Sequence, residues 1–110
     1  MAILSEYNLR QLDRLVKYIN SFEEGNLSLS SLVSNIEGLI GALENFSLSQ
    51  RNELIRKWGV LDEIFAVCLD ENNRPLSTEE RNLINRTLYE LRELCLSLMG
   101  NHDPDKTGFT

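Results

Sequence analysis

The chain has 110 residues, of which 42% are hydrophobic and 25% are charged, and its formal net charge is −6. This length allows one domain with a single hydrophobic core, and the composition is that of a folded protein. Phosphate binding requires concentrated Lys and Arg, so the acidic balance argues against direct nucleic acid binding and favours a basic protein partner. No apolar run approaches the roughly 18 residues of a membrane span, and no signal peptide is visible. We therefore expect a cytoplasmic protein that does not contact membranes.

The first two helices are predicted by apolar residues that recur at steps of three and four. Ser5 can cap the start of the first helix, and Gly25 can adopt the left-handed conformation that commonly ends one. Ser28 or Ser30 caps the second helix, whose apolar pattern extends to Phe46. The apolar positions are Leu9, Leu12, Leu15, Val16, Ile19 and Phe22, and then Leu29, Leu32, Ile36, Leu39, Leu43 and Phe46.

The third helix is predicted over residues 48–71, with Ser47 as its cap. It contains the most hydrophobic stretch of the chain, residues 58–70, in which apolar side chains occupy most sides of the helix. We therefore expect it to be the central helix of the fold, covered by the others. Its core-spaced positions are Leu54, Trp58, Leu61, Phe65 and Cys68.

A turn around Pro75 precedes the fourth helix, which begins at a capping box of Ser77 and Glu80 and ends at Gly100. Four helices of comparable length joined by short loops predict an all-α fold, specifically an antiparallel up-down four-helix bundle. Residues 1–100 would form this single domain, and residues 101–110, which lack periodicity, a flexible C-terminal tail. The core-spaced positions of the fourth helix are Ile84, Leu88, Leu91, Cys95 and Leu98.

No arrangement of catalytic residues is visible in the sequence. The single histidine, His102, falls in the predicted tail, and the motifs of nucleotide-binding, serine hydrolase and zinc protease sites are absent. Cys68 and Cys95 occupy core positions near opposite ends of the predicted bundle, about 18 Å apart by helix rise, so both should be reduced and buried. We therefore expect a protein that is not an enzyme and that holds neither a cofactor nor a metal.

The positions without basic residues are the most informative feature of the charge pattern. Residues 18–50 and 58–73 contain no Lys or Arg, yet both segments carry acids. In an antiparallel bundle, the helix ends at one pole should gather negative charge that steers a cationic partner, although a merely solvated surface is the alternative. That pole would hold Glu23, Glu24, Asp70, Glu71, Glu79 and Glu80 against Arg74 and Arg81, with Arg10, Arg51, Arg56, Lys57 and Arg92 at the opposite pole.

The second helix carries small or uncharged residues on its predicted outer side, including Gly38 and Gly41. Each glycine inside a helix costs roughly 1 kcal/mol relative to alanine, so two of them require a reason. One interpretation is close packing against the third helix near Gly59, and the other is a flat groove against which a partner lies. Asp62 has two interpretations as well, either a partly buried acid in a salt bridge or a contact in an interface.

Three stretches resemble small all-helical bacterial immunity proteins. They are INSFEEGNLSLSSLVSNIEGLIGALEN, RKWGVLDEIFAVCLDE and LSTEERNLINRTLYEL, within residues 12–95. The likeness is to the immunity proteins of contact-dependent growth inhibition systems and, more distantly, to those of tRNase colicins. The residues that carry it are Phe22, Gly25, Leu29, Leu32, residues 39–44, Trp58, Leu61, Asp62, Glu63, Phe65 and Ala66.

The resemblance implies a stoichiometric inhibitor that is monomeric when free and binds one cognate basic nuclease toxin domain, of tRNase type. Such a protein would cover the toxin's basic cleft and imitate the acidity of its RNA substrate. Carboxylates would pair with Lys and Arg of the toxin, and buried apolar contacts would slow release. The residues expected to bind the toxin are Glu37, Glu44, Asp62, Glu63, Asp70 and Glu71.

The competing interpretation is a non-enzymatic scaffolding or regulatory bundle that forms a homodimer. Its self-interface would use the extra apolar residues of the first and fourth helices, namely Tyr18, Tyr89, Leu94 and Leu96. Sizing of the isolated protein separates the two interpretations, because a monomer leaves the acidic surface free for a partner.

Overall fold

The computed structural model describes residues 4–100, and the predicted tail, with His102, lies outside the described residues. The described chain forms four helices and no strand, which confirms the all-α prediction. None of these helices combines the length and the apolarity needed to cross a bilayer. The helices are α1 (Glu6–Glu23), α2 (Leu29–Ala42), α3 (Leu48–Asp70) and α4 (Thr78–Gly100).

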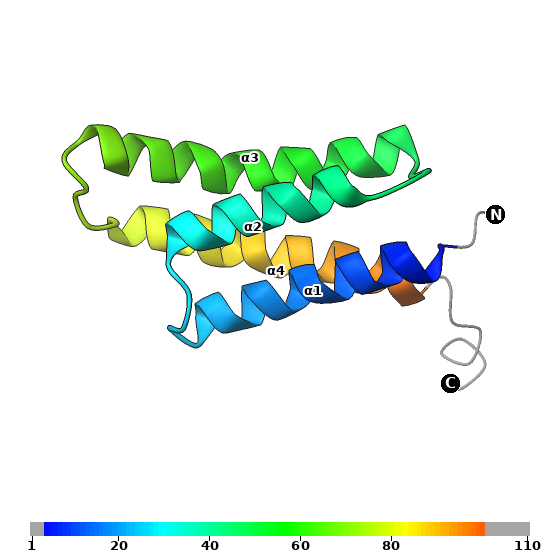
Figure 1. Cartoon of the computed structure of the whole chain (residues 1–110). Helices are drawn as coiled ribbons and strands as arrows, with labels where there is room; N and C mark the ends of the chain where they lie inside the picture. The colour runs from blue at the N-terminus through cyan, green and yellow to red at the C-terminus, as the bar shows by residue number, and fades with distance from the viewer. Residues whose placement is uncertain (1–3, 101–110) are drawn as a thin grey trace.

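The four helices pack together in a ring in which each contacts two neighbours (Figure 1). The neighbouring pairs are α1 with α2, α2 with α3, α3 with α4, and α4 with α1. The loops α1–α2 and α3–α4 lie at one end of the molecule, and the loop α2–α3 lies at the other (Figure 1). The surface between α2 and α3 therefore runs along the molecule from one end to the other.

Side-chain caps begin all four helices where the sequence predicts them. Ser5, Ser28 and Ser47 each accept a hydrogen bond from the backbone N–H three residues later, at 3.0 to 3.3 Å. Ser77 and Glu80 form the predicted capping box, because each side chain accepts from the other residue's backbone N–H. Short-range hydrogen bonds of this kind depend only on residue type and spacing.

The end of α2 differs from the prediction. The apolar pattern extends to Phe46, but the helix stops at Ala42, and Leu43 is already extended with φ −64° and ψ 138°. The Arg51 guanidinium of α3 donates to the carbonyl oxygens of Ile40 at 2.8 Å and Leu43 at 2.7 Å. Arg51 thus satisfies carbonyls that a longer helix would have bonded internally.

The buried side of α1 includes two polar residues that the apolar pattern misses. Asn8 is 3% exposed and Gln11 is also buried, whereas Leu9 is half-buried. The Asn8 amide donates to the carbonyl oxygen of Glu44 at 2.7 Å and its oxygen accepts from the Glu44 N–H at 3.0 Å. One side chain of α1 therefore fixes the start of the α2–α3 loop.

The prediction that α3 is the central helix is wrong. Helix α3 makes substantial contacts with only two helices, α2 and α4, as every other helix of the ring does with its own two neighbours. Only four residues of α3 are buried, namely Leu54, Leu61, Ile64 and Cys68. Several of its other apolar side chains are exposed, among them Leu48, Ile55, Val67 and Leu69. The high apolar content of α3 therefore exceeds what the core of this chain covers.

The most deeply buried residues all occupy predicted positions, whereas the predicted Leu9, Val16, Phe22, Leu29 and Phe46 are half-buried. Fully buried leucines and isoleucines from all four helices meet at its centre, and both cysteines are free and buried, as predicted. The residues with at most 2% exposure are Leu12, Leu15, Ile19, Leu32, Ile36, Leu54, Leu61, Ile84, Leu88, Leu91 and Cys95.

Candidate functional site

The six acids predicted to bind a toxin do not form one patch. Glu37 is exposed in the middle of α2, whereas Glu44 lies in the α2–α3 loop at one end of the molecule. Asp62, which is half-buried, and Glu63, which is exposed, lie on α3. Asp70 and Glu71 are exposed at the C-terminal end of α3, near the other end of the molecule (Figure 1). The six acids therefore extend over the length of the molecule.

Five of these acids are not used by the ion pairs of residues 4–100. None of the pairs there involves Glu37, Glu44, Asp62, Glu63 or Asp70. The interpretation of Asp62 as a salt-bridging acid is therefore not supported within the described residues. The carboxylates of Glu37, Glu44, Asp62, Glu63 and Asp70 remain available for an external cation.

Glu71 differs because it pairs with Arg74 in the α3–α4 loop. Arg74 also donates two hydrogen bonds to Glu80, at 2.8 and 2.7 Å, while the Ser77 N–H donates to the same carboxylate. The guanidinium, followed by the backbone donor, lowers the pKa of Glu80 from 4.5 to about 2, and the two carboxylates raise the pKa of Arg74. Glu71 thus belongs to a network that holds the loop.

The predicted negative pole is partly neutralised by pairs between helices. Arg92, expected at the opposite pole, donates to Glu23 at 2.8 Å and to Asn20 at 3.1 Å, so it lies beside the last turn of α1. Its predicted placement is wrong, because the pair with Glu23 puts it beside an acid of the predicted acidic pole. Together with Arg74, Arg92 removes three acids from the pole, Glu23, Glu71 and Glu80.

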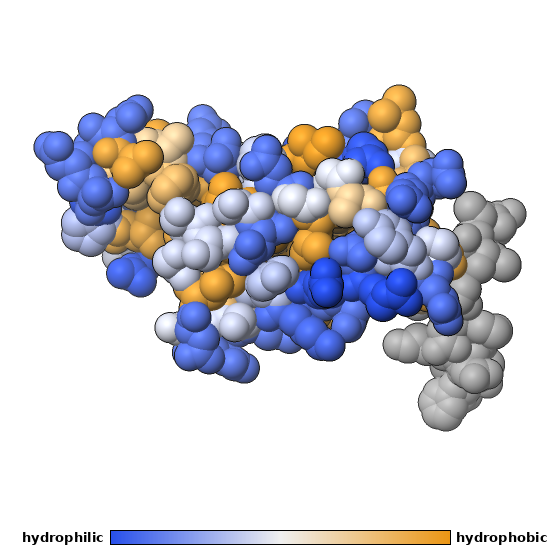
Figure 2. Space-filling model, in the orientation of Figure 1, coloured by the Kyte–Doolittle hydropathy of each residue, from blue (hydrophilic) through white to orange (hydrophobic). Residues whose placement is uncertain are grey.

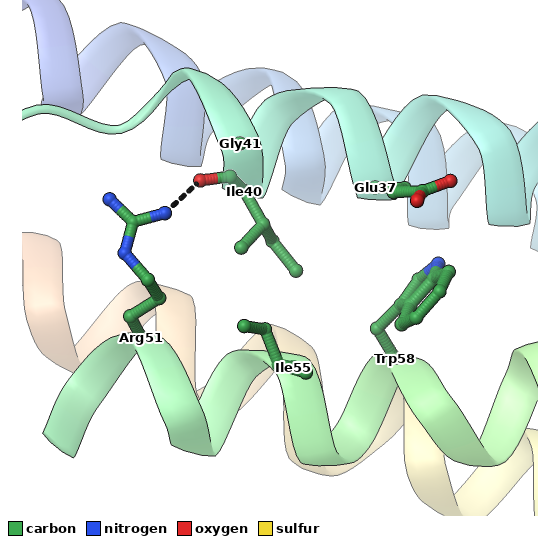
Figure 3. A pocket seen from close by; sticks show the side chains of 6 residues that line it. All are labelled: Glu37, Ile40, Gly41, Arg51, Ile55 and Trp58. Atoms are coloured by element: carbon green, nitrogen blue, oxygen red, sulfur yellow. Dashed lines mark hydrogen bonds between the residues drawn. The ribbon is translucent and has the colours of Figure 1, made fainter. Parts of the chain in front are cut away.

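A hollow of about 220 Å³ opens between α2 and α3 (Figure 3). Ile40 of α2 and Ile55 of α3 point toward each other across it, and the indole of Trp58 stands beside Glu37 at one end (Figure 3). At the other end, Arg51 is engaged with the carbonyl oxygen of Ile40. The hollow is thus mainly apolar, with one carboxylate at its rim. Its lining residues are Glu37, Ile40, Gly41, Arg51, Ile55 and Trp58.

Close packing does not explain the glycines of α2. A Cβ added at Gly38 or Gly41 would meet nothing within 4 Å, and the same holds for Gly59 of α3. The first of the two interpretations given above is therefore wrong. What remains is a bare strip of α2 backbone beside the hollow, where the molecular surface is pale, neither strongly polar nor strongly apolar (Figure 2).

A line of three residues on α3 accompanies the hollow. Ile55, Asp62 and Leu69 follow one another at intervals of seven, so they lie almost above one another along the helix. Ile55 is 41% exposed and Leu69 is 49% exposed. Leu69 borders a second hollow of about 290 Å³, which Phe65 of α3 and Leu29 of α2 also line. The heptad spacing of these residues is present in the sequence, but it does not coincide with the predicted core positions of the third helix.

The residues proposed for a self-interface differ in exposure. Tyr18 and Leu94 are half-buried and pack against the core, whereas Tyr89 and Leu96 are exposed. Two exposed side chains of α4 therefore remain of the predicted four.

The described residues offer few groups that could bind a metal or act as a reactive thiol. No group of three or more His, Cys, Asp or Glu among residues 4–100 is arranged to hold a metal ion. Burial raises the pKa of the Cys95 thiol to about 12, which keeps it protonated at neutral pH. The Cys68 sulfur lies 3.9 Å from a Glu80 carboxylate oxygen.

No protein-family model, no curated protein and no solved structure matches the chain. The resemblance to immunity proteins therefore stays a prediction.

Proposed function

We propose that this chain is a cytoplasmic immunity protein, an antiparallel up-down four-helix bundle that binds one basic nuclease toxin domain, of tRNase type, and neutralises it as a stoichiometric inhibitor. One observation carries the proposal. Helix α2 has Glu37 as its sole charged residue, and α3 beyond Lys57 has only the acids Asp62, Glu63 and Asp70. None of these carboxylates is used by an ion pair within residues 4–100.

The physical argument separates stability from recognition. The ion pairs of residues 4–100 use Asp13, Glu23, Glu53, Glu71, Glu80 and Glu90 together with nearby cations. Those of Glu23 and Glu90 connect helices, those of Glu71 and Glu80 hold the α3–α4 loop, and those of Asp13 and of Glu53 with Arg56 lie within one helix. Four acids define the α2–α3 side, namely Glu37, Asp62, Glu63 and Asp70. They contribute no such pair, and they repel one another weakly. A basic nuclease surface, which must attract RNA phosphates, relieves that repulsion and is drawn toward it at long range.

The exposed apolar side chains of α3 supply the second part of an inhibitor's surface. Charge alone gives fast association and strong salt dependence, whereas slow release requires apolar side chains that become desolvated. Ile55 and Leu69 flank the acid Asp62 on the same line of α3 and can provide such contacts.

A pair of double variants with equal change in net charge tests the proposal. Asp62→Lys with Glu63→Lys changes the α2–α3 side, and Glu24→Lys with Glu93→Lys changes exposed acids elsewhere. Each double variant is expressed with the nuclease toxin domain encoded next to the gene, and circular dichroism confirms that each is helical. We expect the control to protect cells fully and the first variant to lose protection. Full protection by folded Asp62→Lys, Glu63→Lys protein would contradict the proposal.

A further inference from the structure

We propose that the surface between α2 and α3 is the docking site for one amphipathic, cationic helix of the partner. This inference deepens the proposed function and takes the partner's identity from it. The α2–α3 groove comprises the hollow lined by Glu37, Ile40, Gly41, Arg51, Ile55 and Trp58, together with Gly38 of α2 and with Asp62 and Leu69 farther along α3.

The spacing of side chains in the α2–α3 groove matches a helix. Ile55, Asp62 and Leu69 lie about 10 Å apart in succession along α3, so the line spans about 21 Å. A partner helix of about four turns covers that length. Its apolar side chains would enter the hollow beside Ile55 and the one beside Leu69, and a Lys or Arg would lie between them at Asp62.

The charges of the α2–α3 groove select a cation at its centre. Asp62 follows Trp58 by four residues, so it lies one turn farther along the same side of α3. Glu37 of α2 stands beside the indole of Trp58 at one end of the hollow (Figure 3). A cation between Glu37 and Asp62 would therefore meet two carboxylates and the indole of Trp58. Arg51 at the end of the hollow disfavours a second cation there.

The glycines explain how a helix can approach closely. Gly38 and Gly41 are exposed, and no neighbouring atom lies within 4 Å of a Cβ placed on either. Their cost to α2, roughly 1 kcal/mol each, is not recovered by packing within this chain. Bare backbone at these positions lets a partner's side chains reach Ile40 and Ile55, which is a recognised use of glycine.

An apolar side chain of a partner would bind favourably by displacing water from the α2–α3 groove. The hollow of about 220 Å³ has room for several waters, since each occupies about 30 Å³ in the liquid. Ile40, Ile55 and the Trp58 ring offer these waters few hydrogen-bond partners, so their displacement by apolar side chains is favourable.

The first test uses two synthetic helical peptides of about 20 residues that share leucines at seven-residue spacing. One carries Lys between the leucines and the other carries Glu. With the full chain isotopically labelled, we expect the Lys peptide to shift amide resonances of α2 and α3 and to bind at least tenfold more tightly. Equal affinity of the two peptides, or shifts confined to α1 and α4, would overturn the proposal.

The second test uses the adjacent toxin domain and three variants of the full chain. Gly41→Leu fills open space, so it should fold stably and weaken toxin binding at least tenfold. Ile55→Ala should weaken binding about tenfold, whereas Leu96→Ala, its match at 44% exposure on α4, should not change it. Undiminished binding by folded Gly41→Leu protein would overturn the docking site and leave the proposed function standing.

A different result would refute the proposed function itself. If the wild-type chain does not bind the toxin domain, the immunity proposal fails, and the peptide pair alone decides the chemistry of the α2–α3 groove. A dimer of the free chain that Gly41→Leu dissociates would show that a second copy occupies the groove, and would overturn the proposed occupant.

Discussion

The indole Nε1 of Trp58 donates a hydrogen bond of 2.8 Å to the backbone carbonyl oxygen of Val33. This bond joins α3 to α2 beside the hollow and sets the orientation of the ring that borders it (Figure 3). The same residue therefore contributes to the fold and to the candidate docking surface. Variants of Trp58 must be judged by stability and by binding separately.

Trp58→Phe should lower the free energy of unfolding by at least about 1 kcal/mol, since an aromatic ring is kept but the hydrogen bond and part of the indole's packing are lost. Urea denaturation followed by circular dichroism measures the change. Phe22→Leu, a volume change at a half-buried site of α1, serves as a comparison that leaves the α2–α3 contact intact. An unchanged stability of Trp58→Phe would mean that the bond to Val33 contributes little.

Asn8→Ala should destabilise the protein by about 2 kcal/mol, because the N–H and the carbonyl of Glu44 both lose their partner. Asn82→Ala, at an exposed position of α4, is the matched control and should change the stability by less than about 0.5 kcal/mol. Thermal unfolding of the two variants checks this. Equal melting temperatures would contradict the role given to Asn8.

Alanine should have opposite effects at two kinds of glycine. Gly38→Ala and Gly41→Ala should each stabilise the protein by roughly 1 kcal/mol, because the added Cβ meets open space and alanine favours the helix. Gly25→Ala should destabilise it, because Gly25 has φ +84°. Chemical denaturation measures all three. A loss of stability in the first two would show that the space beside α2 is filled in solution.

The Glu80 carboxylate should make stability dependent on acid pH. Its pKa is about 2 in the folded chain against 4.5 without its partners, so the stabilisation is complete above about pH 5 and is lost as the pH falls toward 2. Glu80→Gln lacks this contribution. We therefore expect the stability of the variant and the wild type to converge between pH 5 and pH 2. A constant difference over that range would contradict the assignment.

Local features of the fold could be predicted from the sequence, because caps and turns depend on residues a few positions apart. Ser5, Ser47 and the Ser77–Glu80 box all act as expected. The end of α2 could not, since it depends on Arg51, which reaches back from the next helix. Asn8 could not either, because its value lies in a contact with Glu44, 36 residues away.

The candidate site was predicted in part. Glu37, Asp62 and the open glycines of α2 were recognised, but Ile55 and Leu69 were not, because α3 was expected to be covered on most sides. The charge pattern overestimated the acidic pole, since Arg92, expected at the opposite pole, pairs with Glu23 in the folded chain. Charge positions along a sequence indicate a surface, but long side chains decide which charges remain unpaired.

The central claim is that an acidic α2–α3 side binds a basic toxin domain. Calorimetric titration of the full chain with the toxin domain encoded next to its gene, at about 50 mM and about 300 mM salt, tests it most directly. We expect one-to-one binding that weakens at least tenfold at the higher salt concentration. Absence of binding at both concentrations, or tight binding indifferent to salt, would contradict it.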